Sequence, residues 1–201
     1  MKEIKDWKDI SLEKYYKIKE LLEEPDEYTT YNIIDLLYSV DSVNLPLTEL
    51  KKYSGALEFL NKEVPVVNIK PQYKINGVTY NSNYNLTQVT AAQFIDYQNY
   101  IGTEHFEDYL SVFFIPEGHK YNDGYDIEKV KKDLLELDFP TVKSIAFFFT
   151  IQLAKLQNTS LSYLKKDLRK MKMEKSGAVL SSVCSLKLMK VDFVVLIRNI
   201  I

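Results

Sequence analysis

The chain has 201 residues, a formal net charge of −2 and a single cysteine. The small net charge excludes a strong overall attraction to nucleic acid or to anionic membrane, although it leaves room for a local basic patch. With Cys184 alone, no internal disulfide can form, which fits a reducing compartment. Glycine and proline are scarce, at six residues each, and 46% of the residues are hydrophobic. This composition favours an ordered globular protein over a disordered one.

Tyrosine and phenylalanine are abundant, at 15 and 10 residues. Tyrosine offers a large contact area, a polar tip and a small entropy loss, so it suits surfaces that become interfaces. A compositional bias of a low-GC genome explains the same enrichment. Composition therefore leaves both explanations open.

The first third of the chain, residues 1–63, has the spacing of a small helical unit. Ser11 is the expected N-cap of its first helix, and Pro25 is expected to stop that helix. In the third helix, we expect four leucines to face inward: Leu47, Leu50, Leu57 and Leu60. The three predicted helices cover residues 11–24, 31–40 and 47–62.

From residue 64 onward, the spacing of the apolar residues changes from that of helices to that of β-strands. The β-branched run 64–69 has strand character. Asn76-Gly77 stands between alternating apolar residues and supplies the two positive φ angles of a type I′ turn, so residues 73–80 are predicted to form a β-hairpin. Its polar neighbours suggest an exposed tip or edge. The hairpin is the first candidate interface, with Tyr73, Asn76, Gly77 and Tyr80.

Helical spacing resumes at Thr90, which forms a capping-box pattern with Gln93. Thr103 and Asp126 are the expected N-caps of two further helices, over 103–115 and 127–138. A strongly apolar helix follows over 141–157 and is expected to be central in the core, with one face of Ile145, Phe148, Phe149, Gln152 and Leu156, widened by Phe147 and Ile151.

These elements predict a mainly α protein with a small β-hairpin element (α+β) and a helical bundle core. Residues 64–175 combine the hairpin with the helical core, including an amphipathic helix over 160–175. Residues 176–201 form an apolar C-terminal segment whose secondary structure the pattern does not settle.

No motif for chemistry stands out. His105 and His119 are not spaced as a helical pair, no HExxH occurs, and Cys184 is distant in sequence, so no metal site is expected. Phosphate-binding glycine motifs and the G-x-S-x-G elbow are absent. Cys184 lies in an apolar setting that favours a structural role over nucleophilic chemistry. The sequence therefore predicts a protein that is not an enzyme and that uses no cofactor.

Charge is distributed unevenly. Residues 1–100 hold 11 lysines against 15 acidic residues, whereas residues 155–175 hold seven basic residues against two acidic ones. Head-to-tail contacts between copies would bring opposite signs together, and such contacts close rings. A phosphate-binding patch or a solvated helix face explains the basic stretch equally well. Its candidate interface residues are Lys165, Lys166, Arg169 and Lys170.

The apolar end of the sequence approaches the length of a membrane span, but Lys187, Lys190 and Asp192 interrupt it, so no membrane span is expected. Residues 193–201 are either a last core element or a segment that docks on a neighbour. An apolar stretch without a partner invites aggregation, so some partner is expected. The candidate contacts here are Phe193, Val195 and Ile197.

The order of several sequence stretches is similar to the order found in a known group of proteins. Trp7 precedes ISLEKYYKI, and an acidic turn precedes IIDLLY. The stretches LPLTELKKYSGALEFLN, YKINGVTY, LTQVTAAQFIDYQ and EDYLSVFFIPEGHKYNDGYD follow, and then a Phe-rich helix. Over residues 7–170 this order resembles tail-morphogenesis proteins of tailed bacteriophages, especially the crAss-like phages of Bacteroidetes, and the fold of phage tail-assembly chaperones.

The resemblance implies a structural role in the virion, as a ring-forming protein of the head–tail connector or tail barrel. The partners would then be further copies of the chain and other tail or portal-region proteins, in the virion tail and, during assembly, in the host cytoplasm. A cytoplasmic tail-assembly chaperone is the alternative that it also implies. Packaged cargo and a secondary nucleic-acid contact are more distant options. The family has no active-site residues to transfer.

Overall fold

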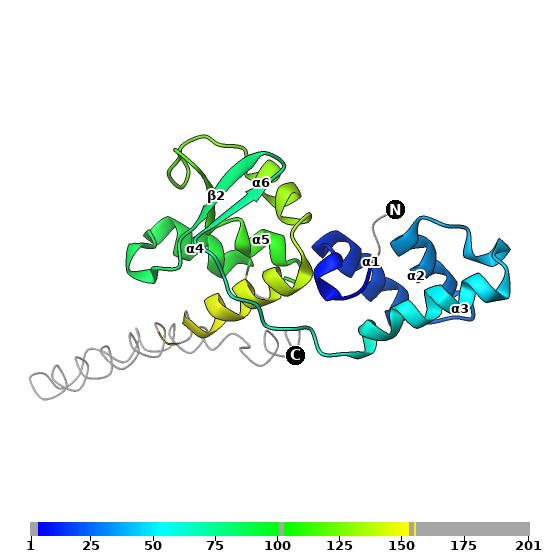
Figure 1. Ribbon diagram of the computed structural model, residues 1–201. Coiled ribbons are helices and arrows are strands. Elements are labelled where there is room, and N and C mark those ends of the chain that lie inside the picture. The colour runs from blue at the N-terminus through cyan, green and yellow to red at the C-terminus, as the bar shows by residue number, and fades with distance from the viewer. Residues whose placement is uncertain (1–3, 101–102, 153–154, 156–201) are drawn as a thin grey trace, which may run out of the picture.

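The computed structural model describes residues 4–100, 103–152 and 155, and it consists of two lobes that lie side by side (Figure 1). One lobe is entirely helical and is built from the first sixty or so residues. In the other lobe, helices pack beside a small antiparallel sheet. The mainly α fold class with a small β element, expected from the sequence, is confirmed.

The helical lobe follows the predicted order closely. The side chain of Ser11 accepts a hydrogen bond from the amide of Lys14 at 3.3 Å, so the first helix begins where the capping pattern placed it. The predicted third helix is divided, because its last turn tightens into a 3-10 helix. The elements are η1 (Trp7–Asp9), α1 (Leu12–Glu23), α2 (Thr29–Tyr38), η2 (Ser42–Asn44), α3 (Leu47–Ala56) and η3 (Leu57–Asn61).

The second lobe combines three strands with helices. Its capping signals are used as predicted: Thr90 and Gln93 exchange side-chain to backbone hydrogen bonds, and Asp126 accepts from two amides of the next helix. A helix over 139–152 closes the described part. The other elements are β1 (Gln72–Ile75), β2 (Val78–Ser82), η4 (Leu86–Gln88), α4 (Ala91–Tyr100), α5 (Phe106–Leu110), β3 (Phe114–Pro116) and α6 (Ile127–Leu134).

The predicted hairpin is confirmed as β1 and β2. Asn76 and Gly77 have φ angles of 48° and 82°, the two positive values that a type I′ turn requires. On the other side of β2, β3 pairs antiparallel and brings Ile115 opposite Asn81. The sheet order β1-β2-β3 leaves β1 as an edge strand.

A seam of aromatic rings and backbone hydrogen bonds joins the lobes. Phe139, at the start of the last helix, stacks on Tyr15 of α1 with ring centroids 3.5 Å apart and also contacts Trp7. The amide of Leu12, in the first turn of α1, donates to the carbonyl of Leu137 at 2.8 Å, and the amide of Phe139 donates to Ile10 at 2.8 Å. Each lobe therefore completes both the core and the backbone pairing of the other.

Three local predictions are wrong. The run 64–69 forms no strand, since no neighbouring strand is there to pair with it in the described chain. The helix expected over 103–115 is only α5, which follows His105 rather than Thr103, because β2 captures the following residues as β3. Leu47 and Phe147 are 75% and 47% exposed, although their spacing predicted burial.

Candidate interaction surface

The segment that joins the lobes, residues 62–71, crosses beneath the last helix without helical or strand structure (Figure 1). Pro65 and Pro71 fix their own φ angles and disfavour helix in the residues before them, which keeps the segment drawn out. Three hydrogen bonds hold it. Trp7 donates through Nε1 to the carbonyl of Lys62 at 3.0 Å, and the amide of Val67 donates to Ser144 Oγ at 3.0 Å. The third runs from the amide of Lys70 to the Tyr73 hydroxyl at 2.8 Å.

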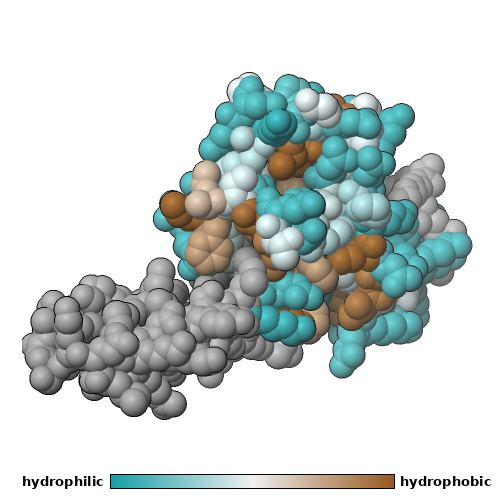
Figure 2. All heavy atoms as spheres, turned by 90° about the vertical axis from the view of Figure 1, so that its left-hand side faces the viewer, coloured by the Kyte–Doolittle hydropathy of each residue, from teal (hydrophilic) through white to brown (hydrophobic). Residues whose placement is uncertain are grey.

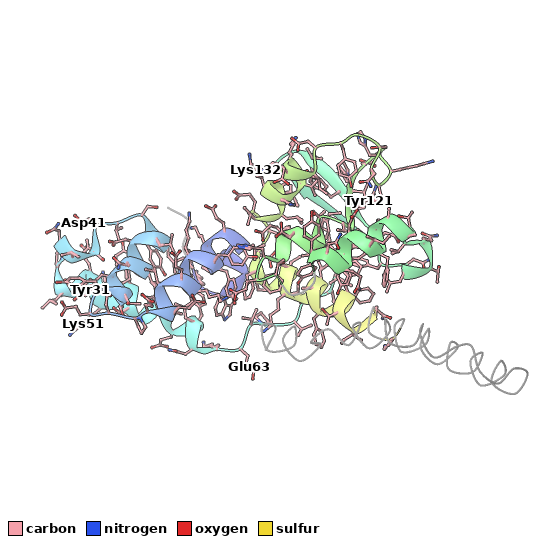
Figure 3. The ribbon with its side chains drawn as sticks, turned by 180° about the vertical axis from the view of Figure 1, so that it is seen from behind. Tyr31, Asp41, Lys51, Glu63, Tyr121 and Lys132 are labelled. Atoms are coloured by element: carbon pink, nitrogen blue, oxygen red, sulfur yellow. The ribbon has the colours of Figure 1, made fainter. Side chains whose placement is uncertain are left out.

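Between this segment and the last helix lies a groove of about 410 Å³. Its floor is mainly apolar, and two of its hydrophobic side chains are markedly exposed: Val66 at 84% and Phe147 at 47%. Figure 3 shows Glu63 at the lower side of this crossing, between the two lobes. We call this feature the linker groove; it is lined by Lys62, Glu63, Val64, Pro65, Val66, Lys143, Ser144 and Phe147.

The linker groove presents backbone groups as well as apolar side chains. Within the described residues, the amides of Val64, Val66, Asn68 and Ile69 donate to no acceptor of the protein. A chain segment with free amides and β-branched side chains can accept a second extended segment, which would supply the missing hydrogen bonds. The linker groove therefore suits an extended apolar peptide better than a compact small molecule.

A smaller pocket of about 320 Å³ lies on the adjoining face of the last helix, between that helix and the loop after β2. Tyr84 packs edge-on against Phe148 there, with centroids 5.2 Å apart. The end of the molecule that carries α4 is different: Figure 2 shows it as a hydrophilic face with small, separate apolar patches. Of these two pockets, the linker groove is the larger.

The structure distributes the predicted hairpin contacts between core and surface. Tyr80 is 1% exposed, so it belongs to the core and offers no surface to a partner. Its hydroxyl donates to the carboxylate of Asp133 in α6, and Asn76 Nδ2 donates to the same carboxylate at 2.9 Å. Burial and this carboxylate raise the pKa of Tyr80. The hairpin is therefore fastened to α6 rather than free.

Of the remaining hairpin residues, Tyr73 is half-buried against Phe114, whereas Asn76 and Gly77 are exposed at the turn. The other candidate contacts lie outside the described residues, together with Cys184: Lys165, Lys166, Arg169, Lys170, Phe193, Val195 and Ile197. The sequence pattern did not predict the linker groove, because it assigns these residues to a strand and to a buried helix face. The available signal was the pair of prolines, Pro65 and Pro71, which disfavour regular structure in the run between them.

Two titratable groups, Tyr16 and His119, make side-chain contacts within the described residues. Tyr16 donates to Glu107 Oε2 at 2.6 Å and accepts from the amide of Phe106 at 2.6 Å, and burial raises the pKa of this phenol. His119 Nδ1 lies 2.9 Å from Asp123 Oδ1 in an exposed loop. No three potential metal-ligating side chains gather anywhere in the described part of the chain.

Among the described helices, none is long and apolar enough to span a bilayer. No protein-family model, no curated protein and no solved structure matches the chain.

Proposed function

We propose that this chain is a non-enzymatic protein-binding component of a multi-copy assembly. The observation that carries the proposal is the linker groove: an apolar channel of about 410 Å³ beside a segment whose amides lack partners in the described chain. Apolar surface that gains hydrogen bonds and loses water on contact is the usual centre of a protein interface. The seam through Phe139 supports the same role, because it joins the two lobes and so holds the linker segment and the last helix, which form the groove, in a fixed arrangement.

The setting we propose is the virion of a tailed phage, where copies form a ring of the head–tail connector or tail barrel. The resemblance over residues 7–170 and the uneven charge of the sequence support this setting. In a ring, each copy presents one surface to the copy before it and a different surface to the copy after it. The linker groove is the candidate for one of these surfaces, and the basic stretch of the sequence, outside the described residues, is the candidate for the other.

The test combines the purified chain with purified particles. Size-exclusion chromatography with light scattering is expected to give a closed oligomer of fixed stoichiometry for the purified full chain. Mass spectrometry of phage particles is expected to find the chain at a fixed copy number. A chain that stays monomeric at every concentration and is absent from finished particles would refute the ring role.

A cytoplasmic tail-assembly chaperone is the second candidate, and the same groove favours it, because an open apolar channel also suits a client segment that is later released. This role predicts co-purification with an unassembled tail protein and loss from mature particles. Substituting Val66 by aspartate should abolish that co-purification, whereas Ile95→Asp, at an exposed apolar position on α4, should not. A stoichiometric copy in the finished virion excludes the chaperone.

A further inference from the structure

We infer that the open edge of β1 binds an extended acidic segment of a partner protein, which adds to the sheet as a further strand. This edge is formed by other residues than the linker groove, so the inference goes beyond the proposed function and does not depend on it. Two observations carry it. They are the backbone groups that β1 turns outward and the charge of the side chains beside them.

The backbone of β1 leaves two residues without partners in the sheet. The amide of Ser82 donates to the carbonyl of Pro71 at 2.8 Å, and in an antiparallel pair such bonds recur at alternate residues. Tyr73 therefore bonds to β2, whereas Gln72 and Lys74 turn their amides and carbonyls to the open side. Neither amide finds an acceptor in the described part of the chain. An incoming strand pairs with this pattern of donors and acceptors.

The side chains of β1 divide between a core face and a solvent face. Ile75 is 5% exposed and Tyr73 is half-buried, so these two residues face the core. Gln72 and Lys74 alternate with them and are exposed on the other face. The amide group of Gln72 donates to the side chain of Asn81 in β2 at 2.9 Å. The exposed face of this edge therefore leaves Lys74 as its open polar side chain.

The charge beside the open edge is positive. Lys74 lies on β1, and Lys70 precedes the strand; both side chains are exposed. Neither lysine forms an ion pair with the residues that the structure describes. Lysine on an edge strand opposes pairing with another basic or neutral edge, and it attracts a strand of opposite charge.

The acidic groups near the hairpin are either distant from this edge or already engaged. Glu117 shares the solvent face, but its amide donates to Thr79 on the far side of β2. Neighbouring strands lie about 4.8 Å apart, so a strand added to β1 would lie about 14 Å from Glu117, beyond a screening length of about 8 Å. Asp133 lies on the core face, where it accepts from Tyr80. Asp126 accepts from two amides of α6 as its N-cap.

Charge also decides which segment the edge accepts. A second copy paired about Tyr73 would place the two Lys74 side chains at diagonal positions on one face, about 7–8 Å apart. Like charges at that distance repel, which disfavours a second copy. Glutamate or aspartate at these positions would instead attract the lysine. The edge therefore fits an extended partner segment with acidic side chains at alternate positions.

NMR titration of the isotope-labelled full chain with synthetic peptides tests this contact. The probe is a short peptide of alternating valine and glutamate with blocked ends. We expect it to shift the amide signals of Gln72 and Lys74 and to slow their exchange with solvent, because both amides gain acceptors. The same peptide with lysine in place of glutamate should bind at least about tenfold more weakly, since each cross-strand charge pair changes sign.

Three variants separate backbone pairing from charge. Gln72→Pro removes one outward donor and keeps both lysines; proline is tolerated where the lost amide faces solvent, and binding should fall about fivefold. Lys70→Glu/Lys74→Glu should weaken the glutamate peptide by about tenfold or more. Lys51→Glu, at the outer end of the helical lobe (Figure 3), is the matched control and should leave the affinity unchanged. The amide of Tyr80, inside the hairpin, reports that the sheet stays formed.

The outcomes are distinct. Binding at Lys74 that weakens in Gln72→Pro and in the charge-reversed variant, but not in Lys51→Glu, supports the contact. Amide signals of Gln72 and Lys74 that stay unchanged up to about millimolar peptide overturn it, and so does equal affinity for the glutamate and lysine peptides. Shifts confined to residues 62–70 would place the peptide in the linker groove and also overturn it. A chain that is monomeric and absent from particles, yet binds the peptide at β1, refutes the ring role and leaves this inference standing.

Discussion

Replacing Tyr80 by phenylalanine removes one hydroxyl from the contact that fastens the hairpin to α6. Tyr80 is 1% exposed and its partner Asp133 is 5% exposed, so water has little access to the carboxylate when the hydroxyl is removed. Within the described part of the chain, Asp133 then keeps one side-chain donor, Asn76 Nδ2 at 2.9 Å. A hydrogen bond to a charged group contributes about 1.5–3 kcal/mol. We therefore expect Tyr80→Phe to lower the free energy of unfolding by about 2–3 kcal/mol.

Urea unfolding followed by the fluorescence of Trp7 measures this loss. Trp7 is the one tryptophan of the chain, and it packs against Phe59 in the helical lobe and Phe139 in the seam, so its emission reports on both lobes. In thermal unfolding, the same loss should lower Tm by about 4–12 °C, at about 2–4 °C per kcal/mol for a chain of this size. Tyr28→Phe is the matched control, because Tyr28 is 51% exposed, and its effect should stay within about 0.5 kcal/mol.

A double-mutant cycle separates the contact from general packing. In the Tyr80→Phe background, Asp133→Asn removes a buried charge that has lost a donor, so the double variant should be less destabilised than the sum of the single variants by at least about 1 kcal/mol. Strict additivity of the two changes, or a Tyr80→Phe effect as small as that of the Tyr28→Phe control, would refute the account of Asp133 as the anchor of the hairpin.

The other predictions concern the seam, the hairpin turn and the loss of stability at high pH. Phe139→Ala should cost about 3–5 kcal/mol in urea unfolding because the ring is 3% exposed between the lobes, whereas Phe147→Ala, 47% exposed, should cost under about 1 kcal/mol; equal losses would contradict the seam. Gly77→Val should cost about 1–3 kcal/mol, since φ is 82° there, while Gly55→Ala inside α3, with open space around it, should stabilise by about 0.5–1 kcal/mol; a neutral Gly77→Val would argue against the type I′ turn. Burial raises the pKa of several tyrosines, that of Tyr125 to about 12, against an ordinary value of about 10. The folded chain therefore keeps phenolic protons that the unfolded chain loses, so this contribution is complete below pH 10 and declines as the pH rises from 10 towards 12. Absorbance at 295 nm together with urea unfolding at each pH measures this decline, and stability that stays constant to pH 12 would contradict it.

Signals that act within a few residues were sufficient for much of the fold. The hydroxyl of Ser11, the pair Thr90 and Gln93, and the carboxylate of Asp126 each satisfy amides of the helix that follows directly, so the sequence predicts where these helices begin. Asn76-Gly77 likewise fixes its own turn through two positive φ angles. In each case the two groups that interact are neighbours in the chain.

Such local signals did not predict the candidate site. The linker groove is formed by segments about eighty residues apart, which touch because Ser144 Oγ accepts from the amide of Val67. The role of Tyr80 depends on Asp133, 53 residues later in the chain. Residues 114–116 became a strand because β2 offered an open edge, against a local pattern that continued a helix. Nothing local in the sequence specifies such partners.

The sequence by itself determined the fold class, the positions of most helix starts, the hairpin turn and the uneven distribution of charge. Only the tertiary structure decided which apolar residues are covered. Spacing marks a side chain as able to be buried, but burial needs a partner surface, and the chain supplies one for Phe139 and Phe149 while leaving Val66 and Phe147 open among the described residues. Those uncovered side chains define the linker groove, and it is on them that the proposed function rests.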